Sequence, residues 1–328
     1  MATIGDVAKE AGVSRSTVST ALSGKKHVSL ETRAKIDAAI KKLNFTVNSG
    51  ARALATSKTM VLGVDLGPAK RRVPHSLSSY VVALAEEAHA EGYRITLTAG
   101  EGDPDALREA IAARSIDGAI LMDVIADDPR SELLRDSATP GVLIGMPPDT
   151  LGLDAVDLDY AEAGRMAVRH TALRQVRRAV LLCWPKHMYE EGSTYATNFL
   201  EGATEAAEAA GVELDVRKTS LDAAQIRHHA VRALEDDSVE ALIVHNDAAL
   251  PVLAEILARR PNSMKSVIGV AAEDVAAAYL LPFETICTHP TATIRAAISA
   301  LIKRLQEGQD PPKKILLQPG VTPSFSNA

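Results

Sequence analysis

A small group of polar residues near the amino terminus has the types and spacing needed to contact a nucleic acid. They are Ser14, Arg15, Ser16 and Thr20. An arginine can hydrogen-bond the edge of a guanine, and hydroxyl groups can contact bases or phosphates. Helical spacing places Arg15, Ser16 and Thr20 on one outward face, at the start of a helix that Ser14 can cap. Such a face is typical of side chains that read the major groove.

The elements that would position these residues lie within residues 3–22. Thr3 can cap a first helix, with Asp6 in the capping-box position, and Gly12 can end it. The second helix buries a separate apolar stripe, which consists of Val18, Ala21 and Leu22. Two short helices around a tight turn predict a helix-turn-helix. The alternative is a helical hairpin of small residues inside a larger core.

A third helix is expected to begin at Ser29 and to share a core with the first two. Its apolar stripe consists of Ile36, Ile40 and Leu43. The three segments carry the phrases DVAxxAGVSxxTVSxxL, HVSxxTRxKIxxAIxxLNF and NxxARxLA, in this order. In wording and spacing they resemble the DNA-reading module of the lactose-repressor family. The resemblance implies a DNA-binding headpiece over residues 1–47.

The same resemblance extends the expected DNA contacts beyond the four residues named first. In the headpiece these contacts are Thr3, Ser14, Arg15, Ser16, Thr17, Thr20, Ser23, His27, Ser29 and Thr32. In the family, the segment matching residues 48–58 is a hinge helix that folds on DNA, pairs with its dimer mate and inserts a leucine into the minor groove. Leu54 matches that leucine, and Asn48 and Arg52 are expected to contact DNA beside it. The alternative for this segment is an ordinary linker, since a helix so short is unstable alone and Gly50 weakens it further.

Charge and composition agree with a DNA-binding head on a larger soluble body. The 328 residues are 46% hydrophobic and 24% charged, enough for two or three domains with substantial cores. Residues 1–58 carry a net charge of +6 and the rest −12, which together give the −6 of the whole chain. No apolar run could span a membrane and no signal peptide is recognisable, so a cytoplasmic protein without membrane attachment is expected. Cys183 and Cys287 lack metal-site or CxxC spacing, so buried free thiols, no metal and no cofactor are expected.

Beyond residue 59, short apolar runs alternate with longer helical patterns. Strands are expected at 61–66, 93–98, 118–122, 142–144, 179–183, 212–216, 241–244 and 267–270. Helices are expected at 79–91, 104–114, 129–137, 161–173, 194–210, 223–236, 248–259 and 294–307. Such alternation predicts an α/β fold with parallel sheets, and its repetition predicts two lobes around a cleft. Residues 59–328 resemble the type I periplasmic-binding-protein-like sensor of the lactose-repressor family, which implies effector binding and a homodimer.

The strand ends of both lobes define the expected effector site. Its residues are Ser76, Leu77, Asp123, Trp184, Phe199, Asn246 and Glu273. Phe199 stands where sugar-binding relatives have an arginine, and Ala271 and Ala272 stand where they have an acidic turn. An effector with an apolar or aromatic portion is therefore expected in place of a simple sugar. Two alternatives remain open: Trp184 as a packed surface aromatic, and Asp247 as a helix cap.

Enzymatic function is not expected, because GxGxxG after the first strand, GxxxxGK[ST], GxSxG and HExxH are all missing. A free-standing solute-binding protein disagrees with the attached head. These observations predict a dimeric transcription regulator, a repressor, that binds a palindromic operator in double-stranded DNA and responds to a small molecule in the cleft. The alternative is a regulator that needs no effector and uses its sensor mainly to dimerise.

Overall fold

The computed structural model describes residues 2–23, 28–45, 58–71, 74–98, 103–260, 265–308 and 311–325. The chain divides into two compact units, Met1–Met60 and Val61–Ala328. Among the predicted DNA contacts, His27, Asn48, Arg52 and Leu54 lie outside the described residues, and so does the side chain of Ser23.

The amino-terminal unit contains three helices, α1 (Ile4–Ala11), α2 (Arg15–Ser23) and α3 (Leu30–Lys42). The predicted capping box is present: Thr3 Oγ1 accepts a hydrogen bond from the Asp6 amide, and the Thr3 amide donates to Asp6 Oδ2 at 2.8 Å. Gly12 ends α1 with a left-handed φ of 65°. The helices share one core of small and branched residues, whose buried members are Val7, Ala8, Ala11, Val18, Ala21, Ile36 and Ala39.

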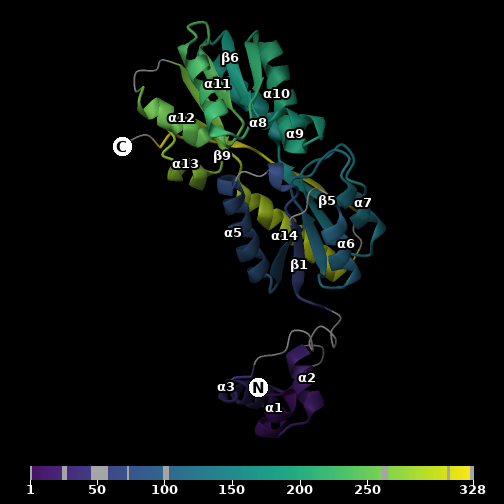
Figure 1. Ribbon diagram of the computed structural model, residues 1–328. Coiled ribbons are helices and arrows are strands. Elements are labelled where there is room, and N and C mark those ends of the chain that lie inside the picture. Colours follow the sequence, from purple (N-terminus) through teal and green to yellow (C-terminus); the bar gives the residue numbers. More distant parts are fainter. Residues whose placement is uncertain are drawn as a thin grey trace. The chain divides into compact units, whose positions relative to one another are not determined.

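The larger unit consists of two α/β lobes, each built on a six-stranded sheet (Figure 1). The first sheet has the order β11-β5-β4-β3-β1-β2, and all of its strands are parallel. Its strands are β1 (Val61–Asp65), β2 (Arg94–Thr98), β3 (Gly118–Leu121), β4 (Gly141–Ile144), β5 (Asp154–Leu158) and β11 (Lys314–Leu317). Its helices are η1 (Ala69–Arg71), α5 (Pro74–Ala90), α6 (Asp105–Ala112), α7 (Pro129–Asp136) and α14 (Pro290–Glu307). The first lobe therefore includes segments from both ends of this unit.

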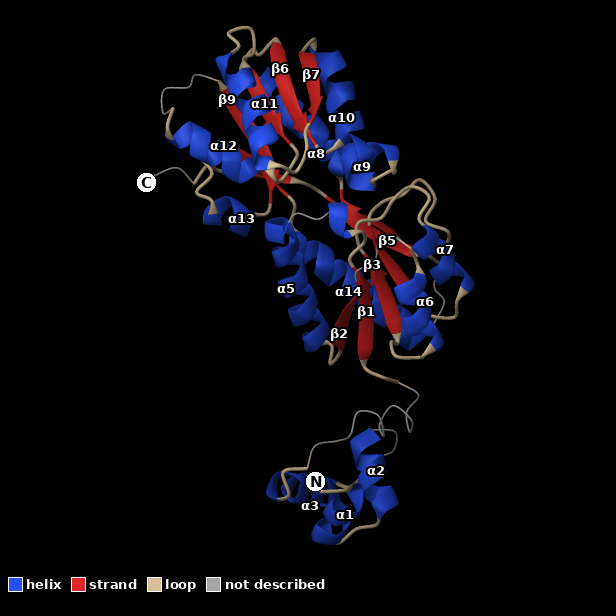
Figure 2. Ribbon diagram, in the orientation of Figure 1, coloured by secondary structure: helices blue, strands red, loops and turns tan. Residues whose placement is uncertain are grey.

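The second sheet has the order β12-β10-β9-β8-β6-β7, and its edge strand β12 is antiparallel to β10. Its strands are β6 (Arg178–Cys183), β7 (Glu213–Lys218), β8 (Ala241–Val244), β9 (Ser266–Ala271), β10 (Glu284–Cys287) and β12 (Gly320–Thr322). Its helices are α8 (Tyr160–Ala172), α9 (Lys186–Glu190), α10 (Thr194–Ala210), α11 (Ala223–Glu235), α12 (Ala249–Ala258) and α13 (Glu273–Ala278). One apolar cluster joins α8 and α10 to the sheet, and another joins α11 and α12 to it. Figure 2 shows these helices beside the strands of the second lobe.

The chain passes between the two lobes three times. The passages follow β5, β10 and β11, so α14 returns to the first lobe and packs on α5. The sequence pattern predicts two lobes, but it does not predict that α14 and β11 complete the first one. Three adjacent passages form a natural hinge, and the strand ends that face each other across it define a cleft.

Other features of the described residues bear on the class of protein. Within them, no helix is long and apolar enough to cross a membrane. They also contain no cluster of three or more His, Cys, Asp and Glu side chains that could hold a metal ion. Cys183 and Cys287 are both buried free thiols.

Candidate functional site

The first turn of α2 presents a polar surface at a helix amino terminus. Ser14, Arg15 and Ser16 are exposed, and no acidic residue lies in this turn. Ser14 Oγ accepts a hydrogen bond from the Thr17 amide at 3.0 Å and lies 2.7 Å from Ser16 Oγ. The free amide groups and positive dipole end of such a turn favour contact with phosphate, and its side chains can reach base edges.

Arg15 lies folded against α1 in this structure. Its guanidinium packs over Gly5, where a Cβ would stand only 2.7 Å from one of its nitrogens. Asp6 is close enough for Arg15 to contribute to lowering the pKa of this carboxyl, after the larger effect of the hydrogen bonds from Thr3. The long Arg15 side chain is exposed, so it can leave this position for a base without unfolding either helix.

Helix α3 holds α2 in position. Arg33 Nη1 donates to the Ala21 carbonyl near the end of α2 at 2.7 Å, and Lys42 pairs with Glu10 of α1 at 2.6 Å. The predicted contacts Ser29 and Thr32 lie at the start of α3, where Ser29 Oγ caps the helix by accepting from the Thr32 amide. The contacts with α1 and α3 therefore hold α2 in a fixed position within the head.

A second candidate site is a cavity of about 140 Å³ between the two lobes of the larger unit. Four of the residues predicted from strand ends line it, namely Ser76, Leu77, Asp123 and Trp184. The first three come from the first lobe and Trp184 follows β6 of the second. The structure thus places these four side chains around one space.

Three other predicted residues do not line this cavity. Phe199 is fully buried and stacks on His245 with ring centroids 3.9 Å apart, so it belongs to the core beneath the cavity wall. Asn246 is also fully buried, and its amide donates to Thr219 Oγ1 at 2.9 Å and to the Ser220 carbonyl at 3.0 Å. Glu273 begins α13 and lines a separate hollow beside α5. The structure therefore does not bring these three residues to the interlobe cavity.

Several cavity residues have no counterpart in the predicted site. They are Arg71, Tyr80, Asp157, Tyr160, Tyr195, His245 and Asp247. Asp157 lies on β5, a strand that the pattern misses because the acidic residue interrupts the apolar run. The sequence pattern leaves Asp247 open as a helix cap; in the structure it lines the cavity, and Asn246 Oδ1 accepts from the Ala248 amide ahead of α12. The rule that ligands contact strand ends could have found Asp157 only if β5 had been recognised.

Carboxyl groups dominate the polar part of the cavity. Burial raises the pKa of Asp157 to about 8, that of Asp247 to about 7 and that of Asp123 to about 6. A hydrogen bond with Ser76 opposes this effect at Asp247, and the charge of Arg71 opposes it at Asp123. The polar side chains of the cavity are therefore mostly acidic, and they lie beside the apolar and aromatic side chains that also line it.

The two buried arginines near the cavity are engaged by acidic partners. Arg71 Nε donates to Asp123 Oδ2 at 2.7 Å, and Arg130 pairs with Asp65 and Asp128, each at 2.7 Å. Arg71 also lies 3.5 Å from Glu191 of the second lobe, and Glu191 pairs with Lys70 at 2.6 Å. These pairs organise the first lobe around the cavity mouth and connect it to the second.

Backbone contacts also connect the lobes beside the cavity. The Ala126 amide donates to the Gly192 carbonyl at 2.8 Å, and the Thr194 amide donates to the Val124 carbonyl at 3.2 Å. Ser79 Oγ donates to Asp274 at 2.6 Å on another side. A molecule in the cavity would contact both lobes and could change how firmly they are held together.

Aromatic rings form the wall of the cavity on the side of the second lobe. Trp184 meets Tyr195 edge to face with centroids 5.4 Å apart, and Tyr160 lies 5.8 Å from Tyr195. His245 stands behind them, and burial lowers its pKa to about 3, so this ring is neutral. The cavity therefore combines aromatic surface with buried acids.

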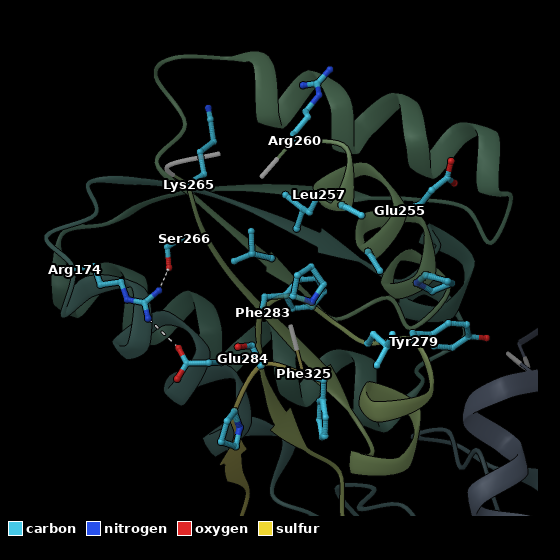
Figure 3. Close-up of a pocket in the computed structure, with 18 residues that line it drawn as sticks. Arg174, Glu255, Leu257, Arg260, Lys265, Ser266, Tyr279, Phe283, Glu284 and Phe325 are labelled. Atoms are coloured by element: carbon cyan, nitrogen blue, oxygen red, sulfur yellow. Dashed lines mark hydrogen bonds and ion pairs between the residues drawn. The ribbon is translucent and has the colours of Figure 1, made fainter. Parts of the chain in front are cut away.

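A larger hollow of about 1170 Å³ lies on the outside of the second lobe (Figure 3). Phe283, Phe325 and Leu257 give it an apolar floor, and Arg174 at its edge hydrogen-bonds Ser266 and Glu284. Among its described lining residues, no buried polar side-chain atom lacks a partner. The interlobe cavity does contain such atoms, so it is the stronger candidate for a small polar ligand.

A helix-turn-helix unit joined to a two-lobed α/β unit with an interlobe cavity defines the class of regulators that combine a DNA-binding head with a ligand sensor. Comparison with known families agrees in both units. Residues 3–48 match the bacterial regulatory proteins of the lacI family, and residues 168–324 match the periplasmic binding protein-like domain. Both units therefore resemble those of regulators in the lacI family.

Curated relatives include transcription regulators. The chain is 33% identical over 174 residues to the HTH-type transcriptional repressor PurR of Mannheimia succiniciproducens, covering 52% of this chain and 51% of the relative. It is 31% identical over 171 residues to catabolite control protein A of Staphylococcus xylosus, covering 51% of each. These matches span about half the length of the curated relatives.

Solved structures agree with the fold over the full length. The Lac repressor dimer bound to operator and the anti-inducer ONPF superposes with a TM-score of 0.79 at 21% identity, covering 100% of this chain and 99% of that one. The complex of the regulator CelR with cellobiose gives a TM-score of 0.68 at 22% identity, with full coverage of both chains. At these identities the likeness concerns the fold.

Proposed function

We propose that this chain is a transcription regulator that binds a palindromic operator as a homodimer and represses transcription. A small molecule in the interlobe cavity would change its affinity for DNA. The observation that carries the proposal is the exposed first turn of α2, held on a three-helix core in a segment that matches the lacI family.

The amino-terminal unit supports the DNA-binding part of this proposal. Residues 1–58 carry a net charge of +6, which suits contact with a phosphate backbone. Arg15 and Ser16 would read bases, and Thr17, Thr20, Ser29 and Thr32 would contact bases or the backbone around them. Thr3 would contribute at the start of α1, together with Ser14, Ser23 and His27.

The segment at residues 48–58 takes its proposed role from the family resemblance alone. Leu54 would insert into the minor groove and bend the operator, with Asn48 and Arg52 contacting DNA beside it. Leu54→Ala should then reduce the bend and weaken operator binding while the larger unit stays folded. Gel mobility of circularly permuted operator fragments measures the bend. If the variant bends DNA as the parent does, the segment is an ordinary linker.

An exposed apolar surface supports dimerisation through the larger unit. Leu280 is 68% exposed and Tyr279 36% exposed directly after α13, and Val82 of the contacting helix α5 is 56% exposed. A palindromic operator requires two copies of the head, and a symmetric pairing across this surface would supply them. Solvent-exposed leucine and valine side chains on or beside two contacting helices are what such an interface would cover.

The interlobe cavity favours an effector-responsive regulator over one that needs no ligand. Buried atoms without a hydrogen-bond partner line it, including Asp157 Oδ2 and Trp184 Nε1. Leaving such groups unsatisfied costs stability in a cavity that serves only to support a dimer. A ligand that offers a hydrogen-bond donor to Asp157 Oδ2 and an acceptor to the Trp184 indole N–H would satisfy them.

The test is a selection of binding sites from random duplex DNA with the purified full chain. A two-fold symmetric consensus is expected, and the Arg15→Ala variant should lose preference at one base position in each half-site. The selected operator is then placed over the promoter of a reporter gene, where expression should fall when the protein is supplied. Enrichment without a consensus would contradict sequence-specific regulation and favour an architectural DNA-binding protein.

A further inference from the structure

The interlobe cavity contains polar atoms that the protein itself does not satisfy. Asp157 is 6% exposed, and its Oδ1 accepts from the Leu158 amide at 2.9 Å, whereas its Oδ2 has no partner. Trp184 is 4% exposed, and its indole N–H has no partner either. Both residues line the cavity. A buried group left in this way indicates a position for a ligand atom of opposite hydrogen-bonding character.

The ionisable side chains around the cavity are mostly acidic. Among its described lining residues, Arg71 is the one permanent cation, against the three carboxyls of Asp123, Asp157 and Asp247. Arg71 is held by Asp123 at 2.7 Å and also faces Glu191. The charge of Arg71 is therefore already paired with Asp123 and Glu191. The ionised carboxyl groups of the cavity would attract a cationic ligand.

The walls of the cavity suit the apolar body of such a ligand and its positive charge. Tyr80, Tyr160, Trp184 and Tyr195 present aromatic rings from both lobes. The faces of aromatic rings attract ammonium groups, and this attraction grows when water is excluded. The hydroxyls of Tyr80 and Tyr160 interact electrostatically with both Asp157 and Asp247, so the aromatic and acidic groups share one small space.

We infer that the cavity binds a small organic cation, an ammonium group on an aromatic or short aliphatic body, with its N–H groups directed at Asp157. This inference rests on the proposed regulator and names the chemical class of its effector. The size of the cavity, about 140 Å³, limits the body to roughly one ring, because a cavity of about 150 Å³ holds benzene. Asp157 comes from the first lobe and Trp184 from the second, so the ligand would bridge them: its ammonium group donates to Asp157 and its body packs on the Trp184 ring. The Trp184 indole N–H is itself a donor, so its partner would be an acceptor on the body of the ligand and not the ammonium group.

Trp184 provides a direct measurement, because it is the single tryptophan of the chain. Benzylamine serves as the cationic probe, and benzyl alcohol serves as its neutral counterpart of similar shape. In a fluorescence titration of the full chain at mildly alkaline pH, benzylamine should change the Trp184 emission saturably. Benzyl alcohol should bind at least about tenfold more weakly, since it lacks the charge. Thermal shift of the same samples gives a readout that does not depend on Trp184.

Two variants test the role assigned to Asp157. Asp157→Asn keeps the shape but removes the charge, and it should weaken benzylamine at least about tenfold. Asp149→Asn removes an exposed carboxylate of the same lobe that lies outside the cavity, where an Asn can still accept from the Leu151 amide. This control should bind benzylamine as the parent chain does. Near-ultraviolet circular dichroism of both variants checks that the lobes remain folded.

Three results would overturn the inference. The first is a neutral ligand, benzyl alcohol or glucose, that binds as tightly as benzylamine. The second is an Asp157→Asn variant, folded by circular dichroism, that keeps full affinity. The third is an absence of benzylamine binding by both fluorescence and thermal shift. If the operator selection succeeds and benzylamine does not bind, the ligand class fails and the regulator stands. If benzylamine binds and the selection yields no consensus, the regulator fails and the cation site stands.

Discussion

Burial of Asp157 makes the stability of the ligand-free chain depend on pH. The pKa of this carboxyl is raised to about 8, well above the ordinary 3.8 of an unfolded aspartic acid. The folded state therefore binds the proton more tightly than the unfolded state. This contribution to stability is fully present below about pH 4 and is lost as the pH rises through 8. Asp247 and Asp123, with pKa values of about 7 and 6, act in the same direction.

Asp157→Asn should flatten this dependence. The parent chain is expected to lose stability from mildly acidic to mildly alkaline pH, by an amount on the order of a few kcal/mol, since one pKa unit corresponds to about 1.4 kcal/mol. The variant should lose less, because asparagine does not ionise. Urea unfolding midpoints across this range measure the difference. Equal slopes for the parent and the variant would mean that the Asp157 carboxyl is not buried in solution.

At the residue scale, the proposed base contact of Arg15 would influence which operator sequence the protein prefers. A bidentate contact from arginine to guanine contributes about 1–3 kcal/mol of discrimination between bases. Arg15→Ala should therefore relax one position in each half-site without changing the fold of the head, since Arg15 is exposed. Competition binding with single-base operator variants checks this. Uniform weakening on every sequence would assign Arg15 to the phosphate backbone.

At the scale of elements, two glycines let α8 and α10 touch backbone to backbone. A Cβ on Gly202 would stand 2.0 Å from the Ala161 carbonyl oxygen, and one on Gly164 would stand 2.2 Å from the Phe199 carbonyl oxygen. Neither atom belongs to a flexible side chain, so the helices themselves would have to separate. These helices also carry Tyr160 and Tyr195, whose rings lie 5.8 Å apart in the cavity wall.

Gly202→Ala should accordingly destabilise the larger unit by about 1–3 kcal/mol or more. It should also weaken benzylamine binding, because moving α10 away from α8 displaces Tyr195 from Tyr160. Glu201→Ala, at the neighbouring exposed position of α10, provides the matched control and should change neither property. Urea unfolding and the Trp184 titration report on stability and binding. A Gly202→Ala chain of parental stability would show that the two helices are not so closely packed.

The elements also show how far the sequence predicts this fold. Strands made of uninterrupted apolar residues, such as β3 and β8, and the long amphipathic helices are predicted within a few residues. β5 is missed because Asp157 interrupts its apolar pattern, although its burial pattern is that of a central strand. β10, β11 and β12 are missed because they are short and pair with strands distant in sequence. Their pairing depends on the three passages between lobes, which local periodicity does not encode.

The same limit applies to the cavity. Ser76, Asp123 and Trp184 follow expected strands or their loops, and parallel strand ends meet at one edge, so their convergence could be predicted. Phe199 and Asn246 could not be placed, because the stacking of Phe199 on His245 and the bonds of Asn246 to Thr219 and Ser220 decide where these side chains point. Spacing in the sequence predicts which helix or strand a residue belongs to, but it does not predict the packing that decides where its side chain points.

At the scale of the whole molecule, ligand binding and DNA binding can be coupled only through the arrangement of the lobes. Asp157 and Asp123 belong to the first lobe, and Trp184 and Asp247 to the second. A cation that contacts residues of both lobes would favour the arrangement in which the lobes are close together. The size of this effect is the difference between its binding free energies for that arrangement and for one with the lobes apart. In the proposed dimer, that arrangement would set how the two first lobes, which follow the proposed hinge residues 48–58 in the chain, are spaced.

The last prediction concerns the dimer itself. Leu280→Lys places a charge at an exposed apolar position of the proposed interface, and two copies related by symmetry would bring these charges together. We expect the variant to sediment as a monomer at concentrations where the parent chain is a dimer. Its affinity for the full palindrome should fall by about tenfold or more, because each head then binds a half-site alone.

Leu173→Lys is the matched control, because Leu173 is 86% exposed and follows α8, away from α5 and α13. It makes the same chemical change at a surface to which we assign no partner. It should therefore remain a dimer with parental affinity for the operator. Both variants should keep the parental response of Trp184 to benzylamine, since neither residue lines the cavity. If the Leu280→Lys chain is still a dimer, the interface lies on another surface. If it is a monomer that binds the palindrome as tightly as the parent chain, operator binding does not depend on dimerisation.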